Sequence, residues 1–289
     1  MIKLKDIYIR DPYILPYHGM YYLYGKESQH DRKFVVYKSL DLLEWTEAKV
    51  VFVPNEDFWA THDYWAPEVH QFQGNFYMLA SFKSDGKCRG TQILKAEVPD
   101  GTFFPLTEHP QTPKDWECLD GTLYVDTEGT PYMVFCHEWT QIQNGTICYA
   151  KLNETLSEFV TEPKVMFRAL DFPFVKNPLR NCECYVTDGP FLYRSAEGQL
   201  YMIWSSFGEK GYFINVLKSD NGEIDGTWTS QNMLFEDDGG HGMLFFDFSG
   251  RLNLIFHYPN NPKGEERAVI FPVREENGKL MIETKGENL

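Results

Sequence analysis

A pattern that recurs five times along the chain constrains its fold more than any other feature. Each copy leads with one polar or small residue, then has an apolar stretch, a glycine-containing turn and, in most copies, an aromatic-rich stretch. The copies begin at Asp11, Ala66, Asp120, Asp188 and His241, which are separated by 55, 54, 68 and 53 residues. That period fits one four-stranded sheet and its loops per copy. The sequence therefore predicts an all-β, five-bladed propeller.

The repeat runs almost from end to end, which predicts a single domain over residues 1–289 with no accessory β-sandwich after the fifth copy. Aromatic residues make up 16% of the chain, as is typical of strands packed face to face. No stretch of ten residues has a helical period, so we expect helix to be nearly absent. Runs of β-branched and aromatic residues predict strands at 21–24, 34–37, 76–80, 132–135, 147–150, 201–204, 214–217 and 252–256.

Composition excludes several classes of function. The net charge of −15 would repel a phosphate backbone, which argues against nucleic acid as a partner. There is no apolar run long enough to cross a bilayer, and the opening residues lack the apolar core of a secretory signal. These features predict a cytoplasmic protein, or a secreted or periplasmic one if a signal peptide was removed. The six cysteines are irregularly spaced, so we expect reduced, structural thiols.

The leading residues of the copies are expected to meet at one end of the propeller axis. The first strand of a blade lies against the axis, so Asp11, Asp120 and Asp188 should project into a central funnel. Acids so close would repel one another, and at least one should have a raised pKa. Two long connections, residues 54–65 and 171–184, are expected to form the walls of this pocket, because long loops in a compact domain are usually functional.

Carboxylates that face one another across a funnel suit the hydrolysis of glycosidic bonds. One acid protonates the leaving oxygen while another activates water. Two other interpretations remain open at this point. Asp-Gly and Asp-Pro are common turn dipeptides, so the acids could cap strand-start turns, or they could hold a metal ion.

Five short motifs, in order and in spacing, resemble glycoside hydrolase family 43. The resemblance covers essentially the whole chain, and it implies a five-bladed propeller with inverting hydrolase activity on arabinosides or xylosides. The motifs are Arg10–Ile14, Trp65–Val69, Leu119–Thr122, Asp188–Arg194 and Gly240–Gly242.

The resemblance implies a role for each acid. Asp11 matches the general base that deprotonates water, and Asp120 matches the acid that tunes the pKa of the proton donor. Asp188 stands at the position of the general acid, where the family usually has glutamate. Because aspartate is one methylene shorter, Glu183 on the nearby loop is an alternative proton donor.

Further residues are candidates for substrate contact. His241 matches a family histidine beside a cation or water cluster, which suggests contact through water and allows a structural calcium ion on the axis, although no cofactor is required. Arg267 resembles a late arginine that reaches the active site. Trp65, Trp139 and Phe58 are candidates for stacking on sugar faces, whereas Trp204 is expected to be buried.

The sequence thus predicts an inverting glycosidase of pentose-containing plant polysaccharides or oligosaccharides. The two long loops favour exo action of the α-L-arabinofuranosidase or β-xylosidase type. One alternative is a non-catalytic carbohydrate-binding propeller, which the aspartate at position 188 suggests. The other is a retaining, fructosidase-like hydrolase, but such enzymes need an Asn-Asp-Pro motif that this chain lacks.

Overall fold

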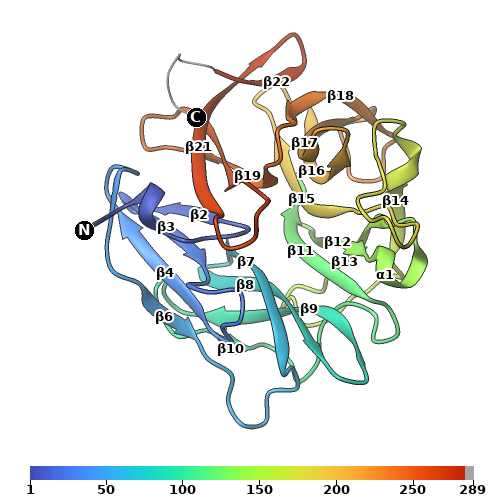
Figure 1. Ribbon diagram of the computed structural model, residues 1–289. Coiled ribbons are helices and arrows are strands. Elements are labelled where there is room, and N and C mark those ends of the chain that lie inside the picture. The colour runs from blue at the N-terminus through green and yellow to red at the C-terminus, as the bar shows by residue number, and fades with distance from the viewer. Residues whose placement is uncertain (284–289) are drawn as a thin grey trace.

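The computed structural model describes residues 1–283. Five four-stranded antiparallel sheets surround a central axis (Figure 1). The strands of each sheet are consecutive in the chain, except that β5 (Glu44–Trp45) lies between the last two strands of the first sheet. The inner strands of neighbouring sheets contact one another around the ring. The predicted all-β, five-bladed propeller is therefore confirmed.

The strands of each blade follow one another from the axis outward. The first three blades are built from β2 (Tyr13–Tyr17), β3 (Met20–Gly25), β4 (Phe34–Ser39) and β6 (Lys49–Phe52); β7 (His62–Phe72), β8 (Asn75–Ser84), β9 (Lys87–Ala96) and β10 (Phe104–Pro105); and β11 (Cys118–Val125), β12 (Pro131–His137), β13 (Thr146–Lys151) and β14 (Lys164–Arg168). The last two are built from β15 (Asp188–Arg194), β16 (Leu200–Gly208), β17 (Gly211–Ser219) and β18 (Trp228–Phe235); and β19 (Gly240–Phe246), β20 (Leu252–Tyr258), β21 (Arg267–Glu276) and β22 (Lys279–Ile282).

Little regular structure lies outside the blades. All eight predicted strand segments fall within strands, and helix is nearly absent, as expected. Within residues 1–283, no helix has the length and apolar character needed to cross a bilayer. The remaining elements are the paired strands β1 (Ile2–Lys3) and β5 (Glu44–Trp45), the short helix α1 (Trp139–Ile142), and the 3₁₀ turns η1 (Leu4–Asp6) and η2 (Ala169–Asp171).

The hydrophobic core lies between the faces of neighbouring blades. Trp204 is fully buried, as predicted, and packs against Phe167 and Phe172 from the third blade and the connection that follows it. Aromatic side chains of this size each bury a large apolar area, and truncating one to alanine typically costs about 3–5 kcal/mol. All six cysteines are free, and four of them are buried.

The ring closes between the fifth and first blades without a shared sheet. Residues just before β2 lie instead along the start of β21. Tyr8 forms an isolated bridge with Arg267, and the backbone N–H of Ile9 donates to the carbonyl of Glu266 at 3.3 Å. The N-terminal segment is thereby fixed against the last blade, immediately before Asp11.

Each inner strand is strained at the axis. Asp11, Ala66, Asp120, Gly189 and His241 all have φ between 45° and 53°, in the left-handed region, and in the last four blades the strand pairing shifts register at this point. This conformation costs a non-glycine residue about 1 kcal/mol or more, and such strain concentrates at functional sites. The equivalent residue of the fourth blade is Gly189, so the repeat assigned from the sequence is out of register there by one residue. Asp188 precedes the strained position.

Gly189→Ala is expected to destabilise the protein. A Cβ at this position would lie 2.9 Å from the ring of His241, in addition to the strain of positive φ. We expect a loss of about 2–3 kcal/mol in the free energy of unfolding, measured by denaturant titration. Gly198→Ala is the matched control, because Gly198 also has positive φ but open space around it. Equal losses in the two variants would contradict close packing of Gly189 on His241.

Candidate active site

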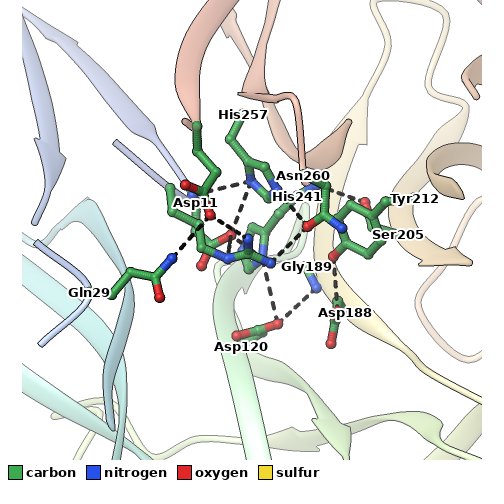
Figure 2. Close-up of polar contacts among 12 residues, drawn as sticks. Asp11, Gln29, Asp120, Asp188, Gly189, Ser205, Tyr212, His241, His257 and Asn260 are labelled. Carbon is green, nitrogen blue, oxygen red and sulfur yellow. Dashed lines mark hydrogen bonds and ion pairs between the residues drawn. The ribbon is translucent and has the colours of Figure 1, made fainter. Parts of the chain in front are cut away.

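A cavity of about 290 Å³ at one end of the axis is lined by several ionisable groups. Asp11, Asp120, Asp188 and His241 all line it, and they converge there from four different blades (Figure 2). The other lining residues are Tyr8, Arg10, Lys26, Ser28, Gln29, His30, Asp63, Trp65, Ala66, Pro67, Leu119, Tyr212 and Lys263.

His241 lies between two of the acids. Its Nδ1 is 3.2 Å from Oδ1 of Asp11 and 3.7 Å from Oδ2 of Asp120. The second of these oxygens also accepts a hydrogen bond at 3.1 Å from the backbone N–H of Gly189. Asp120 thus contacts both the histidine and the turn that carries Asp188.

The preceding blade holds two of the strained residues in place through their backbone N–H groups. Ser81 Oγ accepts the N–H of Asp120 at 2.8 Å, and Ser205 Oγ accepts that of His241 at 2.8 Å. These serines lie at equivalent positions, opposite the inner strands of the second and fourth blades. The site is therefore assembled by contacts between blades rather than within them.

At the seam between the fifth and first blades, a histidine replaces the serine. Nδ1 of His257 accepts the backbone N–H of Asp11 at 3.3 Å, and its Nε2 faces Oδ1 of Asn260 at 3.3 Å. Nδ1 also lies 3.2 Å from Oδ1 of Asp11, so the ring contacts both the backbone and the carboxylate of that residue. His257 is fully buried, and this burial lowers its pKa, so the neutral form is favoured.

The three acids differ in their electrostatic surroundings. Burial raises the pKa of Asp120 and of Asp188, and repulsion from neighbouring carboxylates adds to it. Burial acts the same way on Asp11, but the positive charges of His241 and Arg10 outweigh it and hold the pKa of Asp11 well below its usual range. For His241, burial is outweighed by the acids, and its pKa is raised. The site thus favours one ionised carboxylate and proton-bearing neighbours.

Tyr212 is the direct partner of Asp188. Its hydroxyl donates to Oδ2 of Asp188 at 2.9 Å, and its ring stacks on His257 with centroids 5.7 Å apart. The side chain of Tyr212 is only 1% exposed. Its ring packs directly against Gly240, and a side chain at that position would collide with the ring. Tyr212 therefore contacts both Asp188 and His257, the residue that bonds the backbone of Asp11.

The expected walls of the pocket are partly wrong. No residue of segment 171–184 lines the cavity; Pro173, Phe174 and Lys176 border a separate hollow beside the fourth blade. Glu183 is exposed and bonded to Gln143 and Tyr185, so its carboxylate is occupied outside the cavity. Of segment 54–65, Asp63 and Trp65 line the cavity. The rest of the wall includes Lys26, Ser28, Gln29, His30 and Lys263.

Of the three aromatic residues predicted to contact sugar, one lines the cavity and two do not. Trp65 lines the cavity, with the guanidinium of Arg89 3.8 Å from its ring centroid. Phe58 packs instead among the aromatic side chains between the first two blades, and Trp139 begins helix α1 without reaching the cavity. Their predicted contact with sugar is not supported.

Arg267 also lies outside the cavity, contrary to expectation. Its Nη1 donates to the carbonyl of Glu266, and its guanidinium lies 6.0 Å from the ring centroid of Tyr8. The start of β21 is paired with β20, which directs this residue to the seam between blades. Arg10 provides the cavity's guanidinium instead, bonded to Glu266 and Asn260.

The geometry gives no support for a bound metal ion. Across residues 1–283, no group of three or more histidine, cysteine, aspartate or glutamate side chains is arranged to hold one. Nδ1 of His241 is already engaged by Asp11 and Asp120. An axial calcium ion stays a prediction, and no step below depends on it.

Sequence reasoning missed several residues of the site, including Lys26, Gln29, Tyr212, His257 and Glu266. A signal existed for one of them. In the second strand of its blade, His257 occupies the position that Ser81 and Ser205 occupy in theirs, so the repeat itself marked the position as polar. Tyr212 and Glu266 had no such signal, because their contacts join segments far apart in the chain.

The fold and the acid cluster define a glycosidase-type propeller, and comparison with known proteins agrees. The family model described as glycosyl hydrolases family 43 matches residues 6–276. The chain therefore belongs to glycoside hydrolase family 43.

Relatives include enzymes of arabinan and xylan chemistry. A solved structure of an endo-arabinase from Bacteroides thetaiotaomicron is 38% identical, with a TM-score of 0.91, and the match covers 96% of this chain and 98% of that one. Xylosidase/arabinosidase 43A of Humicola insolens is 25% identical over 56% of this chain and 52% of that protein. An extracellular endo-α-(1→5)-L-arabinanase of Bacillus subtilis is 24% identical over 47% and 45%. The chain spans about half the length of these two curated relatives.

Tyr212→Phe is expected to lower kcat and to move the basic limb of the pH profile upward by about one unit. A donated hydrogen bond stabilises the ionised form of Asp188, so its loss raises the pKa of Asp188 and keeps the acid protonated to higher pH. The measurement is kcat/KM against pH. Tyr201→Phe is the control, since that buried hydroxyl bonds to Glu275, whose strand lies on the fifth blade. A downward shift would contradict the assignment.

Asp120→Asn is expected to stabilise the protein at pH 7 while lowering activity. The raised pKa means that the folded state binds a proton that the unfolded chain releases, so stability is lost as pH rises toward that pKa. Asparagine removes the charge, and its oxygen can still accept the N–H of Gly189. We expect the Tm of the variant at pH 7 to rise by about 2–4 °C for each kcal/mol gained in the free energy of unfolding. The difference in Tm between variant and wild type should become smaller as the pH falls toward 4. The exposed Asp85→Asn serves as the control, and a lower Tm for Asp120→Asn at pH 7 would contradict the prediction.

Proposed function

We propose that the protein is an inverting hydrolase of α-1,5-linked arabinan, with Asp188 as general acid and Asp11 as general base. One observation carries the proposal: at the end of the axis, an ionised carboxylate and two carboxyls of raised pKa converge around His241. This is the division of roles that glycosidic bond hydrolysis requires.

The reaction then follows from the positions of the acids. Asp188 gives its proton to the glycosidic oxygen, which leaves with the electrons of the broken bond. Asp11 takes a proton from water, and the water oxygen attacks the anomeric carbon from the opposite face. The product has the inverted configuration, and both acids are reset by proton exchange with solvent.

Asp120 and His241 act through these two groups. Asp120 holds the N–H of Gly189, the residue that follows Asp188, and so fixes the turn that carries the proton donor. His241 places a positive charge 3.2 Å from Asp11, which keeps that carboxylate ionised in a buried site. Neither residue needs to contact the sugar for this effect.

The preference for arabinan over xylan rests on the endo-arabinase with 38% identity over nearly the whole chain. Exo action was predicted from two loops that were expected to close the cavity. One of them, 171–184, does not line it. We therefore infer that the enzyme cleaves bonds within an arabinan chain.

Asp188→Asn is expected to lower kcat on linear arabinan by about 10²–10⁴-fold, whereas Glu183→Gln is expected to retain most activity. The loss should be much smaller on an aryl arabinofuranoside with a strongly acidic leaving group, because that group departs without protonation. Rates of sugar release from the two substrates provide the measurement. Activity lost in Glu183→Gln but kept in Asp188→Asn would reverse the assignment.

Proton NMR of the first product tests the stereochemistry. Initial appearance of the inverted anomer supports the proposal, and a retained anomer favours the fructosidase-like alternative. Binding of arabinan and xylan without turnover of either would support the non-catalytic carbohydrate-binding propeller.

A further inference from the structure

One aromatic wall of the catalytic cavity packs on a buried arginine that does not itself line the cavity. Arg89 lies on β9, and its guanidinium carbon is 3.8 Å from the ring centroid of Trp65, a residue of the cavity wall. Arg89 is only 6% exposed. Because the guanidinium covers one face of the indole, only the opposite face is left for a ligand.

Two carboxylates fix the guanidinium in this position. Its Nη1 donates to Oδ2 of Asp63 at 3.2 Å, and its Nε donates to Oε2 of Glu138 at 3.2 Å. Asp63 belongs to the second blade and Glu138 follows β12 of the third, so the arginine spans the joint between these blades. Glu138 is also buried, and the positive charge of Arg89 compensates its carboxylate.

The main chain of Arg89 is anchored across the same joint. Its N–H donates to Oε2 of Glu117 at 2.8 Å, and Nζ of Lys83 donates to both oxygens of that carboxylate, at 2.6 and 2.7 Å. Glu117 precedes β11, the strand that carries Asp120. The third blade thus fixes both the backbone and the side chain of Arg89, which leaves the guanidinium little freedom to move away from Trp65.

The strand that carries Trp65 is irregular at this point. The pairing of β7 with β8 shifts register on both sides of Trp65, between His62 and Trp65 and between Trp65 and Glu68. Asp63 has φ of 54°, in the left-handed region. Bulges of this kind redirect side chains beside active sites. The contact with Arg89 therefore supplies an orientation for the indole that the interrupted pairing does not.

We propose that Arg89 is a positioning residue for substrate binding, which holds Trp65 in the orientation that binds the face of a sugar residue. This inference rests on the proposed function, since it takes arabinan as the ligand of the cavity. Arg89 acts through Trp65 alone, so its loss weakens binding without slowing the proton transfers of Asp11 and Asp188.

The test measures kcat and KM on linear arabinan for Arg89→Lys and Trp65→Ala, singly and together. Lysine keeps the charge but lacks the flat group that covers the indole and bonds two acids. We therefore expect Arg89→Lys to raise KM about five- to tenfold, with kcat changed by less than about twofold. In the Trp65→Ala background the same substitution should leave KM unchanged, because the residue through which Arg89 acts is gone.

Lys87→Ala is the matched control. Lys87 is an exposed cation on the same strand, and its Nζ lies 5.8 Å from the ring centroid of Trp59, a tryptophan that does not line the cavity. Its removal should leave both kcat and KM unchanged.

A second variant separates positioning from folding. Arg89→Gln combined with Glu138→Gln removes both charges of the pair, so neither is left buried and uncompensated. We expect this double variant to raise KM as Arg89→Lys does. Thermal unfolding of each variant shows that the kinetics are measured on folded protein.

Several kinetic results would overturn the positioning role. These are an unchanged KM in Arg89→Lys, a loss confined to kcat, or a rise in KM that is equally large in the wild-type and Trp65→Ala backgrounds. Each of them leaves the proposed function standing, because the wild-type protein still cleaves arabinan.

No turnover of arabinan by the wild-type protein overturns the proposed function instead, and tryptophan fluorescence then decides the role of Arg89. The emission spectrum lost on Trp65→Phe is the contribution of Trp65. This contribution should change when the same loss is measured in the Arg89→Lys protein, because the group that covers the indole is altered. An unchanged contribution overturns the positioning role.

Discussion

A propeller whose first and last blades share no strand must close its ring by other means, and here an ion pair between a partly exposed arginine and a buried glutamate spans the seam. Glu266, from just before β21, is fully buried and bonded to Arg10, from just before the first blade. Removing the arginine typically costs about 3–5 kcal/mol, because the charge of the glutamate stays buried and uncompensated. Asp11 follows Arg10 directly, so the position of this proposed general base depends on the same seam.

The three acids can lie close together because they differ in how readily each one ionises. Three buried carboxylates would repel one another strongly if all were ionised. His241 and Arg10 stabilise the charge of Asp11, while burial and repulsion raise the pKa of Asp120 and Asp188. Equivalent positions in a repeated fold thus acquire different protonation states through their nearest neighbours. Strain in the inner strands is the cost of bringing these side chains together.

The repeat was enough to predict the blades, the end of the axis that carries the site, and the convergence of Asp11, Asp120 and His241, since these depend on periodicity alone. The fourth blade was out of register because alignment followed the acid, whereas the backbone equivalence follows Gly189-Pro190, as in Asp11-Pro12 and Ala66-Pro67. Loop placement failed for segment 171–184, because nothing local specifies which way a long connection folds. Of the aromatic candidates, Trp65 does line the cavity. Phe58 packs in the core instead, and an aromatic side chain in the sequence does not by itself distinguish a core position from an exposed one.

The order of the blades has a consequence for biosynthesis. Asp11 emerges early from the ribosome, but His257, which holds its backbone, and Glu266, which anchors its neighbour, lie near the other end of the chain. A nascent chain that has completed four blades therefore carries Asp11, Asp120 and Asp188 without the contacts that orient Asp11. Hydrolytic competence arises only with synthesis of the last blade, so a truncated translation product would be inert however well its earlier sheets had formed.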